Sequence, residues 1–209
     1  MVYRWREWRV EVFAIVIAVG AALTLASSSY ATSRDRTASN AVVADAETLI
    51  TDAGKSNPVD TKKIHLAMDK LHEALRIDPQ NDAAYVDLGF CYGVLRDAND
   101  ATDMYMKATQ LNPSGANFIE LADIYLRVGD AEDALLAANA GLAKDPSNAR
   151  LYNAQGMALN DLQRFGEAAE AWETALRLNP NFPAAKANLQ ALNGGTTGRG
   201  SITKHPAQN

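Results

Sequence analysis

Four prolines recur along the chain at a nearly constant spacing, and this period constrains the fold more than any other feature. The prolines are separated by 34, 33 and 34 residues, at Pro79, Pro113, Pro146 and Pro180. A small residue stands twelve positions before each proline and another five positions before it, as Ala67 and Ala74, Ala101 and Ala108, Ala134 and Gly141, and Ala168 and Ala175. Seven residues are two helical turns, so each pair shares one helix face. The pattern predicts one repeated helical unit.

A second helical pattern lies between these segments. Tyr85, Leu88, Gly89 and Tyr92 stand at positions i, i+3, i+4 and i+7, which is typical of one helix face. The same spacing returns as Phe118, Leu121, Ala122 and Tyr125, and as Tyr152, Gln155, Gly156 and Leu159. Each unit is therefore predicted to be a pair of helices joined by a short turn. One pair buries too little apolar surface alone, so the pairs must stack.

These positions resemble the tetratricopeptide repeat (TPR) family, whose pattern is Trp-x2-Leu-Gly-x2-Tyr, then Ala-x3-Phe, then Pro. The aromatic residue after the first alanine is present as Tyr105 and Trp172, whereas Leu71 and Ala138 replace it in the other units. The resemblance implies an all-α fold, a right-handed TPR solenoid. Small residues at Gly89, Ala122 and Gly156 are expected to let paired helices approach closely, and Tyr92, Tyr125 and Trp172 to fill the spaces between units.

The repeat pattern also predicts the domain organisation. Three repeats are expected over residues 82–180 and a degenerate unit over residues 37–81, whose first helix has no Leu-Gly-x2-Tyr face. Residues 181–193 are predicted to form a capping helix, because a solenoid needs a polar outer surface at its end. Residues 194–209 have no apolar periodicity and are expected to be a disordered tail.

Residues 1–36 have a different character and are predicted to be a membrane anchor or a signal segment. Residues 12–33 carry no charge, and a helix needs about 20 residues to cross ~30 Å of hydrocarbon. The span 10–30 supplies them, and Trp5 and Trp8 among arginines are typical of a membrane interface. These features favour a single-pass helix. Small residues at Ser29 and Ala31 leave open a cleaved signal peptide.

The distribution of arginines predicts the orientation of this segment. Arg4, Arg6 and Arg9 precede the apolar run, and Arg34 and Arg36 follow it. The excess of basic residues before the run places the N-terminus in the cytoplasm. The chain is therefore expected in a bacterial inner membrane with its TPR body in the periplasm, or as a secreted periplasmic protein if the segment is cleaved.

Composition argues against several other classes of function. The chain has 25 acidic and 20 basic residues, a net charge of −5, which argues against nucleic acid as a partner. A single cysteine can form neither an intrachain disulfide nor a cysteine-based zinc site. His65 and His72 lie two helical turns apart, about 10.5 Å, too far to share a metal. We therefore expect no enzyme activity, no cofactor and no metal.

The resemblance implies that the first helix of each pair lines a concave groove and contacts a partner segment. Residues beyond the packing positions of these helices are the candidate site: Val86, Phe90, Gly93 and Val94; Ile119, Asp123, Leu126 and Arg127; and Asn153, Met157, Asn160 and Asp161. The lysine and asparagine clamp with which one TPR subclass holds a C-terminal carboxylate is absent. A segment with apolar anchors and a basic flank matches better. The alternative is that Val86, Phe90 and Ile119 only pack.

Charge is consistent with a protein partner. Residues 37–193 hold 13 basic and 22 acidic residues, and such a surface steers basic segments toward it. The sequence thus predicts a non-catalytic scaffold for protein–protein interaction that supports assembly of a membrane or secretion-type complex. The alternatives are a self-associating, homo-oligomeric TPR module and a regulatory subunit of a separate membrane enzyme.

Overall fold

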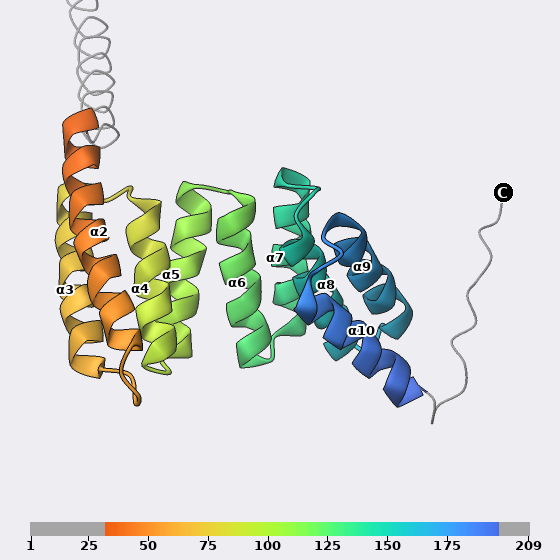
Figure 1. The fold of residues 1–209 in the computed structure, drawn as a ribbon. Coiled ribbons are helices and arrows are strands. Elements are labelled where there is room, and N and C mark those ends of the chain that lie inside the picture. The colour runs from red at the N-terminus through yellow and green to blue at the C-terminus, as the bar shows by residue number, and fades with distance from the viewer. Residues whose placement is uncertain (1–31, 197–209) are drawn as a thin grey trace, which may run out of the picture.

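The computed structural model describes residues 32–196, and over this range the chain forms helices and no strand. Nine helices follow one another over these residues, and Figure 1 shows them arranged in a row from α2 to α10. Their bounds are α2 (Ser33–Gly54), α3 (Thr61–Ile77), α4 (Asp82–Val94), α5 (Ala98–Leu111), α6 (Gly115–Val128), α7 (Ala131–Lys144), α8 (Ala149–Asp161), α9 (Phe165–Leu178) and α10 (Pro183–Thr196). The expected all-α solenoid is confirmed, while its right-handed twist stays a prediction.

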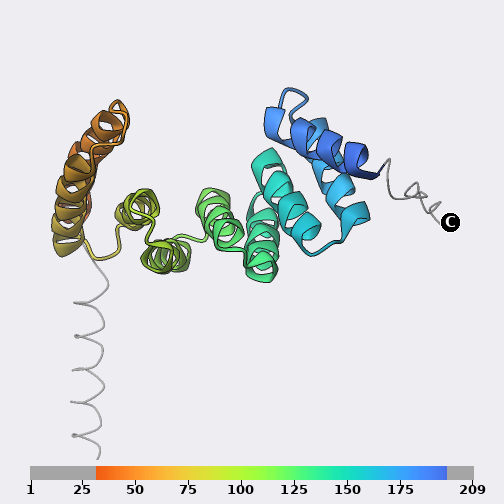
Figure 2. The same ribbon diagram turned by 90° about the horizontal axis from the view of Figure 1, so that it is seen from below.

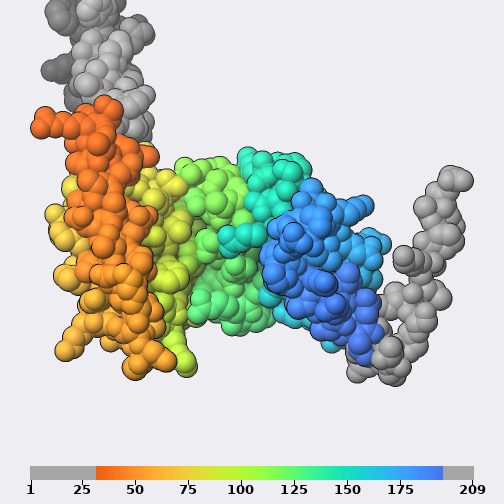
Figure 3. Space-filling view, in the orientation of Figure 1, coloured from red at the N-terminus to blue at the C-terminus, as the bar shows by residue number. Residues whose placement is uncertain are grey.

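The helices pack as consecutive hairpins. The most extensive contacts join α2 to α3, α4 to α5, α6 to α7 and α8 to α9, and α10 packs on α9. The space-filling view shows one continuous body, with α2 and α3 at one end and α10 at the other (Figure 3). Each hairpin thus buries its apolar surface against the next, as the repeat pattern predicts.

The two helices of a hairpin play unequal parts in stacking. The first helices contact one another in series, α2 with α4, α4 with α6, α6 with α8 and α8 with α10. Within the described range, the second helices α3, α5, α7 and α9 make no contact with one another. The row of hairpins therefore closes on its first-helix side and opens on its second-helix side. Figure 2 shows this row from below, running from α2 to α10.

Glycine and an aromatic residue fit together inside two hairpins. A Cβ added to Gly89 would lie 2.9 Å from the ring of Tyr105, and one added to Gly156 would lie 2.5 Å from Nε1 of Trp172. In the hairpin between them, Ala122 and Ala138 occupy the matching places and are fully buried. Trp172 therefore fills space within its own hairpin, which corrects the expectation that it packs between units.

The turns inside the three clear repeats share a backbone conformation. Arg96, Gly129 and Gln163 occupy equivalent places and have φ values of 65°, 83° and 61°. A left-handed φ favours glycine because a Cβ is crowded there. Only the middle turn has a glycine, so Arg96 and Gln163 hold a strained conformation that the hairpin packing enforces.

Helix boundaries follow from capping groups. Each second helix ends at the residue directly before a recurring proline, namely Asp78, Asn112, Asp145 or Asn179. The proline ring disfavours a helical conformation in the residue before it. The next first helix starts at Asn81, Ser114 or Asn148, whose side chain accepts a backbone N–H bond. Such N-caps stabilise a helix by about 1 kcal/mol.

The degenerate unit is joined to the repeats by buried polar contacts. The Ser39 hydroxyl donates to the Ala74 carbonyl at 2.9 Å, and the Asn81 amide donates to Ser39 at 2.8 Å. The buried Asp78 carboxylate accepts from the Arg36 guanidinium. Together with Val43, Ala46 and Ala53, which α2 buries in the core, this network joins α2 to the array without the Leu-Gly-x2-Tyr motif.

Both ends of the described fold differ from the predicted bounds. Helix α2 begins at Ser33 and not at 37, because Thr32 and Asp35 form a capping box: the Asp35 N–H donates to the Thr32 hydroxyl, and the Thr32 N–H donates to Asp35. The capping helix α10 continues to Thr196 and not to 193. The predicted membrane segment over residues 10–30 lies outside the described residues, as do residues 197–209 of the predicted tail. From residue 32 to residue 196, no helix has the length and apolar character needed to cross a membrane.

The Gly156–Trp172 contact yields a stability prediction. Changing Gly156 to Ala places a Cβ against the indole, and we expect a loss of about 1–3 kcal/mol in the free energy of unfolding. Urea denaturation followed by far-UV circular dichroism measures it. Gly166→Ala is the matched control, because nothing lies within 4 Å of that Cβ. Equal effects of the two substitutions would contradict the packing role.

Candidate partner-binding face

The predicted site residues lie on α4, α6 and α8, three first helices that contact in series. We call the surface that these residues form the first-helix face. Its members are Val86, Phe90 and Val94 on α4, Ile119, Asp123 and Arg127 on α6, and Asn153, Met157, Asn160 and Asp161 on α8. Because equivalent helices pack side by side, residues about 34 positions apart in the sequence become neighbours in space.

Phe90 is the apolar residue of this face that is open to solvent. Its side chain is 47% exposed. Val86 and Val94, one turn away on either side, are half-buried and pack on the core. Ile119, in contrast, is 3% exposed. The structure therefore places Ile119 in the core, where it cannot meet a partner, and leaves Phe90 as the available anchor.

A charged cluster lies beside Phe90 on the next helix. Arg150 on α8 lies 3.5 Å from Glu120 and 3.9 Å from Asp123, both on α6. Burial raises the pKa of Asp123, and the neighbouring Glu120 raises it further, while Arg150 and Arg127 oppose that rise. The cluster thus holds both signs of charge, with the acidic groups partly desolvated.

Arg127 ties two repeats together. Its Nη2 donates to the Gly93 carbonyl on α4 at 3.2 Å, and a Cβ added to Gly93 would lie 3.1 Å from its guanidinium. The glycine at position 93 therefore leaves room for the arginine. Sequence reasoning selected Arg127 but missed Glu120 and Arg150, because only the packing of α6 on α8 brings them into the cluster.

The third repeat contributes less open surface than the sequence predicts. Asn153 accepts from the Asn188 amide of the capping helix at 3.1 Å, and Met157 packs in the core around Trp172. Asn160 donates to Asp161 at 3.3 Å. Asp161 itself lines a hollow that includes Asp130 of the α6–α7 turn. The open part of the first-helix face is therefore centred on Phe90 and the charged cluster.

Asp87 adds an unusual carboxylate to this region. Its Oδ2 is buried and has no hydrogen-bond partner in the described structure. Burial raises the pKa of Asp87 to about 7, and Glu47 on α2 raises it as well. Asp87 lies three residues before Phe90 on α4, so it is a desolvated acid within one turn of the exposed anchor. Burial also raises the pKa of Cys91 to about 12, so its thiol stays neutral and unreactive.

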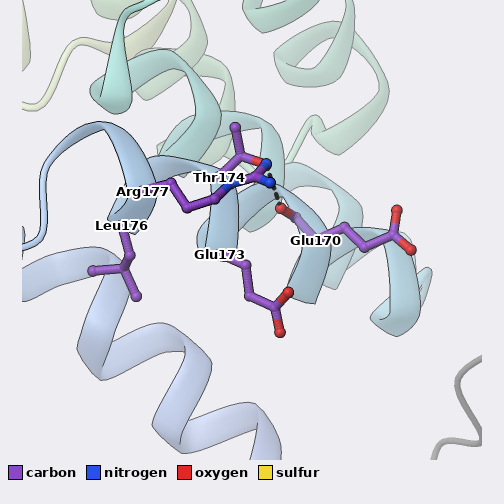
Figure 4. Close-up of a pocket in the computed structure, with 5 residues that line it drawn as sticks. All are labelled: Glu170, Glu173, Thr174, Leu176 and Arg177. Carbon is purple, nitrogen blue, oxygen red and sulfur yellow. Dashed lines mark hydrogen bonds between the residues drawn. The ribbon is translucent and has the colours of Figure 1, made fainter.

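Two further features of the described residues bear on chemistry, namely the grouping of metal-ligating side chains and the hollows on the surface. Between residues 32 and 196, no three His, Cys, Asp or Glu side chains are grouped to hold a metal ion. The largest hollow described, about 610 Å³, is lined by residues of α9 alone (Figure 4). There the Arg177 guanidinium donates to the Thr174 hydroxyl, which donates to the Glu170 carbonyl. These side chains are satisfied within their own helix, so this hollow is an open helix surface.

Comparison with known proteins agrees with this geometry. Residues 149–182 match the family model described as tetratricopeptide repeat. The fold is a TPR solenoid. The matched repeat comprises α8, α9 and the residues up to Phe182. The same hairpin recurs twice before it, as α4 with α5 and as α6 with α7.

Solved structures show how widely this solenoid fold occurs. The chain resembles PilF of Pseudomonas aeruginosa, with a TM-score of 0.68 and 18% identity, covering 78% of this chain and 71% of that one. It resembles MamA of Desulfovibrio magneticus RS-1, with a TM-score of 0.59 and 20% identity over 73% and 85% of the two chains. The first TPR of Spaghetti (RPAP3), bound to the HSP90 peptide SRMEEVD, has a TM-score of 0.54 and 25% identity, covering 57% of this chain and 96% of that one.

One curated sequence relative is the cytochrome c-type biogenesis protein CcmH of Escherichia coli (strain K12). It is 28% identical over 140 residues, which are 65% of this chain and 40% of that protein. The protein of the same name from Shigella flexneri matches to the same extent. This chain therefore spans less than half the length of the curated relatives it matches.

Asp87 gives a pH prediction. Because burial raises the pKa of the Asp87 carboxyl from its ordinary value to about 7, folding favours the protonated form. Its contribution to stability is complete below about pH 4 and is lost as the pH rises through 7. At pH 8, the free energy of unfolding of Asp87→Asn should therefore exceed that of the parent by about 1–3 kcal/mol. At pH 5 this difference should be smaller.

Urea titrations of the two proteins at pH 5 and pH 8 measure this difference. Asp69→Asn on the exposed surface of α3 is the control, and it should show no pH-dependent gain. A parent protein whose stability relative to Asp87→Asn did not change between the two pH values would contradict a raised pKa at Asp87.

Proposed function

We propose that the protein is a non-catalytic scaffold that binds a segment of a partner protein on its first-helix face. The observation that carries this proposal is the exposure of Phe90. An aromatic side chain that is 47% open to water lies beside a partly desolvated charged cluster, on the layer where the repeats close together. Aromatic residues in such settings dominate the binding free energy of protein interfaces.

The chemistry of the face defines the expected ligand. Glu120 and Asp123 lie on α6, the first helix next to that of Phe90, and Arg150 of α8 lies 3.5 Å and 3.9 Å from them. A segment with an apolar anchor for Phe90 and a basic flank for these carboxylates complements it. The RPAP3 structure supports the mode of binding, since a TPR domain of similar fold is bound there to a peptide.

The proposed setting is the bacterial cell envelope. Residues 1–36 would anchor the chain in the inner membrane, or direct its export, and the solenoid would lie in the periplasm. The matched relatives are named for cytochrome c-type biogenesis, which favours assembly of a maturation complex over a pilus or secretion system. In this role the solenoid holds its partners and leaves the chemistry to other subunits.

The test is a comparison of two lysine substitutions at matched exposure. Phe90→Lys removes the anchor from the first-helix face, while Leu66→Lys changes a side chain of α3 that is 49% exposed. Crosslinking and affinity purification from native membranes, quantified by mass spectrometry, should recover the partner with the parent and with Leu66→Lys. Recovery with Phe90→Lys should fall by roughly tenfold, as expected for loss of an interface hot spot.

Circular dichroism of all three proteins checks that each is folded, and light scattering on the full chain measures its oligomeric state. Equal recovery with Phe90→Lys and the parent would disprove the role of this face. A crosslinked species that consists of this chain alone would support the self-associating alternative in place of the scaffold.

A further inference from the structure

The second-helix side of the solenoid carries another recessed surface, which we call the outer trough. One open hollow of about 460 Å³ is lined by residues of α7 and of the α8–α9 turn, and an adjoining one of about 520 Å³ by residues of the α6–α7 turn and the end of α8. Glu132 and Leu162 line both, so the two hollows adjoin at these residues. The first hollow is also lined by Leu135, Leu136, Asn139 and Arg164. The second is also lined by Val128, Gly129, Asp130, Ala131 and Asp161.

The trough results from how the hairpins stack. Second helices α7 and α9 do not contact each other, although α7 packs on α8. The hollows lie where α7 and the α6–α7 turn meet the end of α8 and the α8–α9 turn. The position of the trough is consequently set by the same unequal stacking that closes the first-helix side.

Apolar side chains in the trough are unusually exposed. Leu136 is 65% exposed, the highest value for a large hydrophobic residue in the described structure, and Val128 is 47% exposed. Leucine and valine this open to water, gathered in one recess with Leu135 and Leu162, are typical of an interaction site. The floor of the trough can thus accept apolar anchors.

The rim of the trough is acidic. Asp130, Glu132 and Asp161 line it, and Arg164 is its only basic lining residue. The Arg164 guanidinium is already held by both carboxylate oxygens of Glu167, at 2.8 and 2.6 Å. Its positive charge is therefore neutralised within α9, and the three carboxylates leave a net negative potential around an apolar floor.

We propose that the outer trough binds a short basic amphipathic helix of a partner protein. Its apolar stripe packs on Leu136 and Val128, and its lysines or arginines face Glu132 and Asp161. This site does not include Phe90, and it is formed by α7, the α6–α7 and α8–α9 turns and Asp161 at the end of α8. The protein then has two docking surfaces, so it can hold two partners together, which goes beyond binding one segment on the first-helix face.

Two synthetic helical peptides of about 14 residues test the proposal, one of leucine and lysine and one of leucine and glutamate, with leucines at i, i+3, i+4 and i+7. The full 209-residue chain is held in zwitterionic nanodiscs. Fluorescence anisotropy measures the affinity, and methyl NMR of Leu136 and Val128 reports the location. The lysine peptide should shift these methyl signals and bind more weakly as salt rises, while the glutamate peptide should not bind.

Matched variants separate the trough from general attraction. Leu136→Ser should weaken binding of the lysine peptide by roughly tenfold, whereas Leu178→Ser, which changes a leucine that is 43% exposed on α9 outside the trough, should not. Glu132→Gln with Asp161→Asn should weaken it, whereas Asp45→Asn on α2 should not.

Three results would overturn the proposal. The first is equal affinity of Leu136→Ser and Leu178→Ser for the lysine peptide. The second is that the peptide shifts methyl signals of the first-helix face alone. The third is that the Leu136 methyl signals shift with protein concentration in the absence of peptide. The last would show that a second copy of the chain occupies the trough. Because Phe90 takes no part in these measurements, loss of the trough proposal would leave the proposed function standing, and the reverse also holds.

Discussion

The structure depends on the burial of one hairpin against the next, in which both helices of each hairpin pack on the first helix of the following one. No hairpin can bury its own apolar surface, so each unit is stable only as part of the row. The first helices contact each other directly, and the second helices contact only first helices. This inequality gives the molecule two unlike sides, and both candidate surfaces follow from it.

Complementary volumes inside the hairpins allow this close stacking. Glycine faces tyrosine or tryptophan in two hairpins, and alanine accompanies alanine in the one between. Interiors are packed nearly as densely as organic crystals, so a large residue on one helix requires a small one opposite. At the TPR aromatic position of the middle repeat, Ala138 accompanies Ala122, and both are fully buried.

The two ends of the row solve the problem of an exposed edge differently. At the N-terminal end, α2 has no glycine–aromatic fit and is held by the buried contacts of Ser39, Asp78 and Asn81. At the C-terminal end, α10 covers α9 with Leu192 and reaches α8 through Asn188. The capping helix therefore takes part of the first-helix face for itself, which moves the open surface toward Phe90.

The period of the prolines and the small residues determined the fold, because any chain with that spacing must form equivalent hairpins and stack them. It also placed the predicted site residues on the first helices α4, α6 and α8. Sequence position did not decide which of those residues are open: Phe90 is exposed, whereas Ile119, which occupies the place of Val86 in the next repeat, is buried. Exposure depends on the side chains of neighbouring helices, and their contact is a tertiary property. The same reason applies to three other features, which arise only when helices distant in the sequence pack side by side. They are the Arg150 cluster, the buried Asp87 oxygen without a hydrogen-bond partner, and the outer trough.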